Sequence, residues 1–219
     1  RGTPKGISEI GRELGVRALV QGSVRKSGTR IRITVQLIDA ATEEHLWSQV
    51  YDREMEDVFA IQRDIAQRVS KALRVRLLQS GTEAIDRRAT DKLDAYALFL
   101  KGKTDLNTRT QDGLQKAIRS FEHAINLDSQ YALAYTGLAE AHAVLALLEM
   151  VPPHESFPMA KAAAERSTHL DDQLAEAHAS LGLVRFQYDW DWRGAASEFQ
   201  RASELNPSYA PAHQFRADL

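Results

Sequence analysis

The stretch YDWDWRGAASEFQRASELNPSYAPAH, residues 188–213, decides how the second half of this chain folds. Two Asp-Trp pairs stand near its start and suggest either a ligand site or a turn between helices. Its end, LNPSYAPAH, has two counterparts earlier in the chain. The three copies begin at Leu127, Leu170 and Leu205, so they are 43 and 35 residues apart. These spacings are close to the period of about 34 residues that is typical of tetratricopeptide repeats.

Small and aromatic residues at fixed places in the last complete unit predict a helical hairpin. Gly182 and Ala195 remove side-chain bulk where two antiparallel helices would cross, and Leu181 and Phe199 fill the space beside that contact. The sequence therefore predicts an all-α tetratricopeptide (TPR) solenoid over residues 94–219. It would contain about three hairpins and the start of a fourth.

The other two units vary this pattern, and the Asp-Trp pairs fit a structural role within it. The first unit keeps only Gly102 at the close-approach position. In the third unit, Asp191 is well placed to cap the second helix. We expect Trp190 and Trp192 to pack over the end of the first helix, at Phe186 and Tyr188. A ligand box remains the alternative.

The first ninety residues show a different periodicity. Apolar and polar residues alternate strictly in TRIRITVQLID, residues 29–39, as in a half-buried strand. Residues 17–26 and 45–54 predict two further strands, and apolar spacings of three and four predict helices at 7–14 and 58–73. The expected fold is α+β, an antiparallel meander with covering helices. Three strands make a thin core, so we expect the sheet to take another strand from upstream or through self-association.

Four short motifs in this region carry a resemblance to a known family. They are GVR at 15–17, GSVR at 22–25, LIDA at 37–40 and EHLW at 44–47. In order and spacing, residues 5–75 resemble the second half of the TolB-like amino-terminal domain of bacterial multidomain regulators. The resemblance implies a sensory or scaffolding module without known catalytic residues. It also implies an attached effector, such as a nucleotide cyclase, a winged-helix DNA-binding domain or a protein kinase.

Charge divides the chain in the same place as periodicity. Residues 1–90 carry 16 Lys and Arg against 12 Asp and Glu, whereas residues 91–219 carry 12 against 18. We therefore predict a partial TolB-like domain at 1–80, a linker at 81–93 and repeats at 94–219. The basic excess of the first part is too small for a nucleic-acid footprint, so we expect no nucleic acid to bind this chain.

The sequence offers no reactive constellation. It has no cysteine, its seven histidines are scattered, and GSVRKSGT lacks the spacing of a phosphate-binding loop. We therefore expect no catalytic residue, no metal, no cofactor and no enzymatic activity within this chain. No apolar run approaches the roughly 20 residues that cross a bilayer, so we expect no membrane insertion. A cytoplasmic location is favoured, and a membrane span upstream would make it periplasmic.

What remains is a binding surface. The first helices of successive hairpins would line the inner wall of a solenoid, and such walls bind peptides or helices. The candidate partner-binding residues in this register are Thr136, Glu140, Glu176, Leu183, Phe186 and Gln187. Their mixed apolar and acidic character predicts basic or amphipathic partners, unless a neighbouring repeat covers them. The alternative function is a small-ligand sensor that regulates the attached effector, with the sheet face of Trp47 and Tyr51 as the pocket wall.

Overall fold

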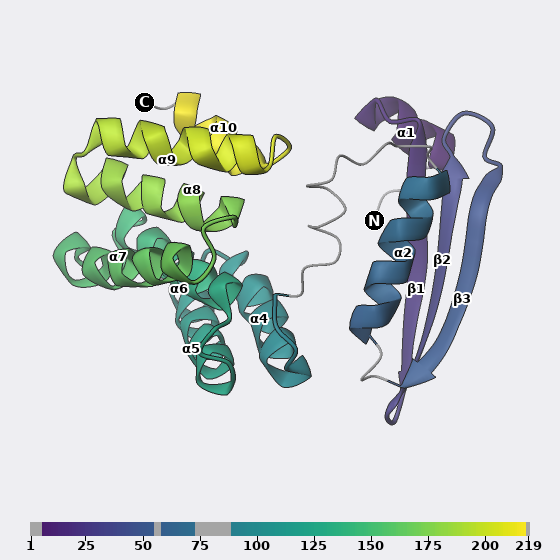
Figure 1. Cartoon of the computed structure of the whole chain (residues 1–219), viewed down its shortest axis with the longest axis horizontal. Coiled ribbons are helices and arrows are strands. Elements are labelled where there is room, and N and C mark those ends of the chain that lie inside the picture. The colour runs from purple at the N-terminus through teal and green to yellow at the C-terminus, as the bar shows by residue number, and fades with distance from the viewer. Residues whose placement is uncertain (1–5, 55–57, 73–88, 218–219) are drawn as a thin grey trace. The chain divides into compact units, whose positions relative to one another are not determined.

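A computed structural model describes residues 6–54, 58–72 and 89–217 of the chain. The polypeptide divides into two compact units, Arg1–Arg88 and Ala89–Leu219. Figure 1 shows that the first unit contains the strands and that the second is helical in its described part. Most of the predicted linker at 81–93 falls outside the described residues.

In its described residues, the first unit is a three-stranded antiparallel sheet with the order β1-β2-β3 and two helices (Figure 1). Its elements are α1 (Ile7–Leu14), β1 (Ala18–Ser27), β2 (Arg30–Asp39), β3 (His45–Glu54) and α2 (Val58–Ala72). α1 is capped at its C-terminal end by Gly15, whose φ of 64° is left-handed and favours glycine. Gly28, with a φ of 60°, allows the tight turn between β1 and β2.

The strand pattern read from the sequence is confirmed in β2. Ile31, Ile33 and Val35 alternate with more exposed neighbours, and they pack with Tyr51 of β3 and Ile61 of α2 in one apolar cluster. The Tyr51 hydroxyl lies 2.7 Å from Oδ2 of Asp64 on α2, which gives this buried phenol a hydrogen-bond acceptor. The core of the first unit therefore lies between α2 and the β2–β3 part of the sheet.

The second unit is a series of antiparallel helical hairpins joined in chain order (Figure 1). Its elements are α4 (Leu93–Leu106), α5 (Gln111–Leu127), α6 (Ala132–Leu147), α7 (Pro153–Leu170), α8 (Ala175–Val184), the π-helical turn η2 (Arg185–Asp189), α9 (Trp192–Leu205) and α10 (Ala210–Ala217). The hairpins are α4–α5, α6–α7 and α8–α9, and α10 packs against α9.

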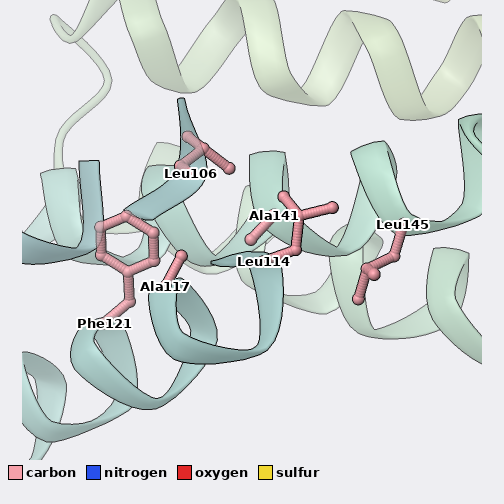
Figure 2. Close-up of a cluster of buried hydrophobic side chains, with 6 residues drawn as sticks. All are labelled: Leu106, Leu114, Ala117, Phe121, Ala141 and Leu145. Carbon is pink, nitrogen blue, oxygen red and sulfur yellow. The ribbon is translucent and has the colours of Figure 1, made fainter. Parts of the chain in front are cut away.

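Phenylalanine rings set the distance between neighbouring helices. The ring of Phe121 on α5 is fully buried between two glycines, Gly102 of α4 and Gly137 of α6. A Cβ on either glycine would lie 2.6 Å from Cε1 of Phe121, far inside van der Waals contact. Figure 2 shows Phe121 within the apolar cluster that joins α4, α5 and α6. The close-approach role predicted for Gly102 is confirmed.

The third hairpin repeats this contact, with one difference from the sequence-based prediction. Gly182 directly faces Phe199, since a Cβ on Gly182 would lie 2.5 Å from Cε1 of that ring. Leu181 does not fill the space beside this contact. It packs instead with Ala139 and Ala164 of the preceding hairpin. The prediction missed this because adjacent residues of α8 lie on faces with different partners. One face packs against α9 of the same hairpin, and the other packs against the preceding hairpin.

The Asp-Trp pairs are confirmed as part of a turn, but the tryptophan packing was wrong. Asp191 caps α9, accepting a hydrogen bond of 2.9 Å from the backbone N–H of Gly194. Trp190 and Trp192 remain 75% and 57% exposed. Tyr188, over which they were expected to pack, stacks on Phe157 of α7 at a centroid distance of 5.4 Å. Phe157 of the preceding hairpin therefore already occupies the space beside Tyr188.

We predict that Gly182→Ala destabilises the second unit although alanine is the better helix former. Helix propensity alone would raise the free energy of unfolding by about 1 kcal/mol. The added Cβ overlaps the Phe199 ring, and overpacking of this kind costs about 1–3 kcal/mol. Urea unfolding followed by circular dichroism measures the net change, which we expect to be a loss.

A double-mutant cycle with Phe199→Leu gives the control. The smaller side chain makes room for the new methyl group, so Gly182→Ala should cost less in the Phe199→Leu background than in the natural one. Equal costs in both backgrounds would show that the ring does not limit this position.

Candidate partner-binding surface

The first helices of successive hairpins form one continuous wall. α4 contacts α6, α6 contacts α8, and α8 contacts α10. Four of the six positions at which the sequence predicted partner binding lie on α6 and α8, and the other two lie on η2, which follows α8. The six candidate residues divide into those that are buried against other helices of the unit and those that are at least partly exposed.

Thr136 and Leu183 lie inside the unit and are not available to a partner. Thr136 is 6% exposed, and its hydroxyl lies 3.2 Å from the backbone oxygen of Ala132 and 2.8 Å from Oγ of Ser167 on α7. Leu183 is 8% exposed and belongs to an apolar cluster with Phe157. Helical periodicity placed both on the wall, but α7 covers them. Thr136 therefore joins the two helices of its own hairpin, whereas Leu183 joins α8 to the preceding hairpin.

Glu140 and Glu176 are partly exposed on neighbouring first helices. Glu140 on α6 accepts a hydrogen bond of 2.9 Å from Nζ of Lys103 on α4, and both side chains are about 40% exposed. Glu176 lies in the first turn of α8, where a carboxylate interacts favourably with the helix dipole. Burial raises the pKa of Tyr209, and the charges of Glu176 and Glu140 raise it further. Both carboxylates therefore influence the same hydroxyl electrostatically.

Phe186 and Gln187 lie on the π-helical turn η2, where Phe186 is half-buried and Gln187 is exposed. A π-helical turn holds more residues than an α-helical one, so the register extrapolated from α8 does not continue here. Lys161 of α7 fixes this turn with an ion pair of 2.8 Å to Asp189. The turn at the C-terminal end of α8 is therefore tied to the preceding hairpin.

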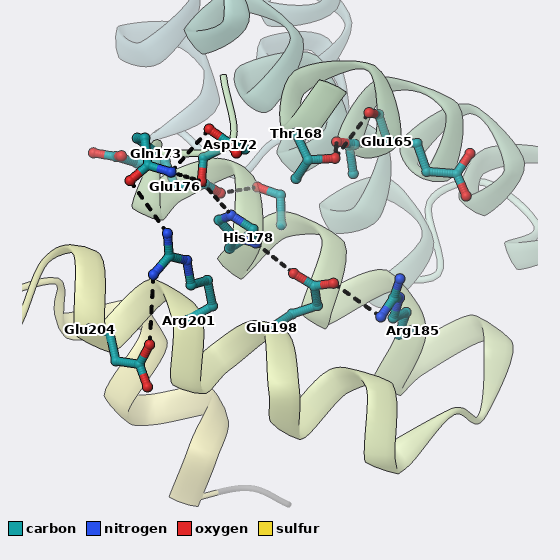
Figure 3. A network of polar contacts seen from close by, with 12 residues as sticks. Glu165, Thr168, Asp172, Gln173, Glu176, His178, Arg185, Glu198, Arg201 and Glu204 are labelled. Carbon is teal, nitrogen blue, oxygen red and sulfur yellow. Dashed lines mark hydrogen bonds and ion pairs between the residues drawn. The ribbon is translucent and has the colours of Figure 1, made fainter. Parts of the chain in front are cut away.

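A polar network behind the wall was not predicted from the sequence (Figure 3). Nδ1 of His178 lies 2.6 Å from Oε2 of Glu198, and its Nε2 lies 2.9 Å from the backbone oxygen of Asp172. The other carboxylate oxygen of Glu198 lies 3.0 Å from Arg185. Both ring nitrogens face acceptors, so the doubly protonated imidazolium satisfies the geometry best. The hairpin brings His178 of α8 beside Glu198 of α9, and the sequence analysis did not pair residues across it.

The ion pair between Lys103 and Glu140 was also missed, although the repeat pattern contained the information to predict it. Lys103 follows Gly102, and Glu140 follows Ala139, at equivalent places in two consecutive units. Residues at equivalent places in stacked repeats are neighbours, so opposite charges there predict an ion pair. Aligning the two units residue by residue would have found it.

In the ranges 6–54, 58–72 and 89–217, no three His, Asp or Glu side chains gather as metal ligands would. In the same ranges, no helix combines the length and the apolar character that a bilayer crossing requires.

Curated bacterial proteins share sequence with this chain, among them the two that follow, whereas no family model matches it. "Putative adenylate cyclase 3" of Rhizobium meliloti (strain 1021) is 30% identical over 192 residues, which cover 84% of this chain and 32% of that protein. "Transcriptional regulator HilA" of Salmonella typhimurium is 26% identical over 117 residues, covering 53% of this chain and 21% of that protein. The chain thus spans no more than about a third of either relative.

Several solved structures align with more than half of the chain at low sequence identity. The first TPR domain of human RPAP3 aligns with 57% of this chain and 88% of its own, at 20% identity and a TM-score of 0.47. The Sgt2 TPR domain from Aspergillus fumigatus aligns with 60% of this chain and 80% of its own, at 18% identity and a TM-score of 0.48.

We predict that His178 and His142 titrate on opposite sides of the ordinary histidine pKa. The hydrogen bond to Glu198 raises the pKa of His178 most, the Asp172 carbonyl adds to this, and burial and Arg201 oppose it. Burial alone lowers the pKa of His142. NMR titration of the imidazole protons measures both values, and Glu198→Gln should bring down the pKa of His178 alone.

Stability should follow from this shift. A raised folded-state pKa means that the His178–Glu198 contact stabilises the fold fully below about pH 6.5, and that this contribution is lost as the pH rises through the raised value. The stability difference between the natural chain and Glu198→Gln should therefore shrink from pH 6 to pH 9. The titration of His142 is common to both proteins and cancels. A difference that grows with pH would contradict the assignment.

Proposed function

We propose that this chain is a non-catalytic protein-interaction region of a bacterial signalling protein, in which the helical hairpins bind a peptide or a partner domain. One observation carries the proposal. The first helices of successive hairpins contact one another and leave partly exposed polar side chains, among them Glu140 and Glu176, along one wall. Such a wall offers an extended partner many small contacts and requires no reactive group.

The charge of the wall favours a basic or amphipathic partner. Lys103 partly neutralises Glu140, whereas Glu176 has no ion-pair partner among the described residues. The repeat region as a whole carries an acidic excess, so it attracts basic partners at long range. Complementary charge of this kind contributes more to the association rate and to specificity than to affinity.

The two curated relatives support a place beside an effector domain. One is named an adenylate cyclase and the other a transcriptional regulator, and each is much longer than its match to this chain. We therefore propose that the α/β unit is TolB-like, that the helical unit is of the TPR type, and that both regulate or scaffold an effector in a longer protein. The proposed effector is a nucleotide cyclase or a DNA-binding domain.

The alternative of a small-ligand sensor has weaker support. Trp47 and Tyr51, the candidate pocket wall, pack with Ile61 and Ile65 of α2 in the core of the first unit. The Tyr51 hydroxyl is already hydrogen-bonded to Asp64. Both side chains thus have structural roles, and nothing about them requires a ligand.

We predict that Glu140→Lys and Glu176→Lys each weaken the binding of basic peptides. Reversing a wall charge replaces attraction by repulsion, and we expect a loss of affinity of roughly tenfold. The measurement is fluorescence anisotropy with a library of labelled synthetic peptides that differ in net charge and amphipathic character.

Glu122→Lys is the matched control, because Glu122 is also a helical glutamate. It lies exposed on α5, which is the second helix of its hairpin and not part of the wall. It should leave binding unchanged at fixed ionic strength. If both wall variants bind as the natural chain does, or if the control weakens binding equally, the wall is not the binding surface.

A further inference from the structure

The outer edge of β1 is an open place for another strand. β1 pairs with β2 along all ten of its residues, and within the described residues no strand pairs with its other edge (Figure 1). Natural edge strands are usually short, bulged or protected, because a free row of backbone N–H and C=O groups invites pairing. Ten residues is long for a strand, and the paired register from Ala18 to Ser27 contains no bulge. The edge is therefore regular enough to pair along its whole length.

An exposed apolar face accompanies this edge. Val20 and Val24 pair with Leu37 and Ile33 of β2, so they point to the core side of the sheet. Their β2 partners are 1% and 9% exposed, whereas Val20 is 57% and Val24 65% exposed. The apolar cluster under α2 draws its members from β2, β3 and α2 and includes no residue of β1. The core side of β1 is thus the uncovered margin of a buried face.

We propose that β1 pairs antiparallel with β1 of a second copy of this chain, with Gly22 on the two-fold axis. In this register, Val20 of each copy lies opposite Val24 of the other. Directly opposite residues on one face of an antiparallel pair have Cβ atoms about 4.5–5.5 Å apart, so both valines gain an apolar neighbour. The two sheets become one, and the apolar face runs across the axis without a break.

The spacing of the residues selects this pairing over others. Val20 and Val24 stand symmetrically about Gly22, so the strand is complementary to itself. A shift by two residues would set Val24 opposite Gly22, or Val20 opposite Gly22, and would lose the valine pairs. A second copy is thereby favoured over an unrelated strand, which need not have this symmetry.

Charge favours the antiparallel direction. Arg25 and Lys26 lie at one end of β1, whereas the other end, at Ala18, pairs with Asp39 of β2. The two-fold axis sets Lys26 of the second copy opposite Ala18, beside the acidic end of β2 at Asp39, whose carboxylate also accepts hydrogen bonds from the backbone N–H groups of Ala41 and Thr42. A parallel pairing would bring the two basic ends together instead. Exposed ion pairs contribute little energy, so these charges decide the orientation and the valines supply the affinity.

Sedimentation velocity over a dilution series of the 219-residue chain tests the proposal. We expect a reversible dimer at micromolar concentration. Val24→Lys places two lysines against valines in each dimer and should raise the dimer dissociation constant by roughly tenfold or more. The matched control is Val50→Lys, since Val50 is a 53% exposed valine on β3 that points to the opposite face. Circular dichroism confirms that both variants fold.

Cross-linking tests the register separately, and the absence of cysteine makes it clean. With a short thiol cross-linker, a mixture of Val20→Cys and Val24→Cys should form the heterodimer, whereas each variant alone should cross-link poorly. If the 219-residue chain stays monomeric over the dilution series, the proposal is wrong. This holds even if another strand pairs with the edge in a longer chain. Preferential cross-linking of identical positions, or a dimer that Val24→Lys leaves intact, overturns it equally.

Discussion

The packing of a phenylalanine ring against glycine is the contact on which the helical unit depends. Phe121 has no exposed surface and occupies the space that a Cβ would need on Gly102 and on Gly137. One ring thus fixes the separation of α4, α5 and α6, which belong to two hairpins. In the third hairpin, the ring of Phe199 contacts Gly182 on one side and the ring of Phe215 of α10 on the other. Because interiors are close-packed, these contacts leave little freedom in how the hairpins stack.

This stacking determines which side chains a partner can reach. It buries Leu183 against the preceding hairpin and leaves Glu140 and Glu176 partly exposed, while Thr136 is buried against α7 within its own hairpin. Polar contacts then reinforce the same arrangement, because the Lys103–Glu140 pair joins two successive hairpins and the Lys161–Asp189 pair joins the next two. The stacking of the hairpins therefore decides which side chains of the helical unit face solvent.

Sequence alone predicted the elements well and the environment of single residues less well. Three strands, the hairpins, the Gly102 contact and the Asp191 cap follow from local periodicity and local hydrogen bonding. The burial of Thr136 depends on Ser167, 31 positions away, and the exposure of Trp190 depends on Tyr188 stacking with another hairpin. Such contacts arise from tertiary packing, so a helical register that treats one helix at a time misses them.

Hydrogen exchange of the Phe121→Leu variant tests the central claim most directly. If the ring holds two hairpins at once, the amides of α4, α5 and α6 lose protection together, while those of β2 keep theirs. Leucine leaves part of the space between Gly102 and Gly137 empty, and the loss of packing is felt in all three helices. Protection lost in α5 alone would contradict the account, since the ring would then stabilise only its own helix.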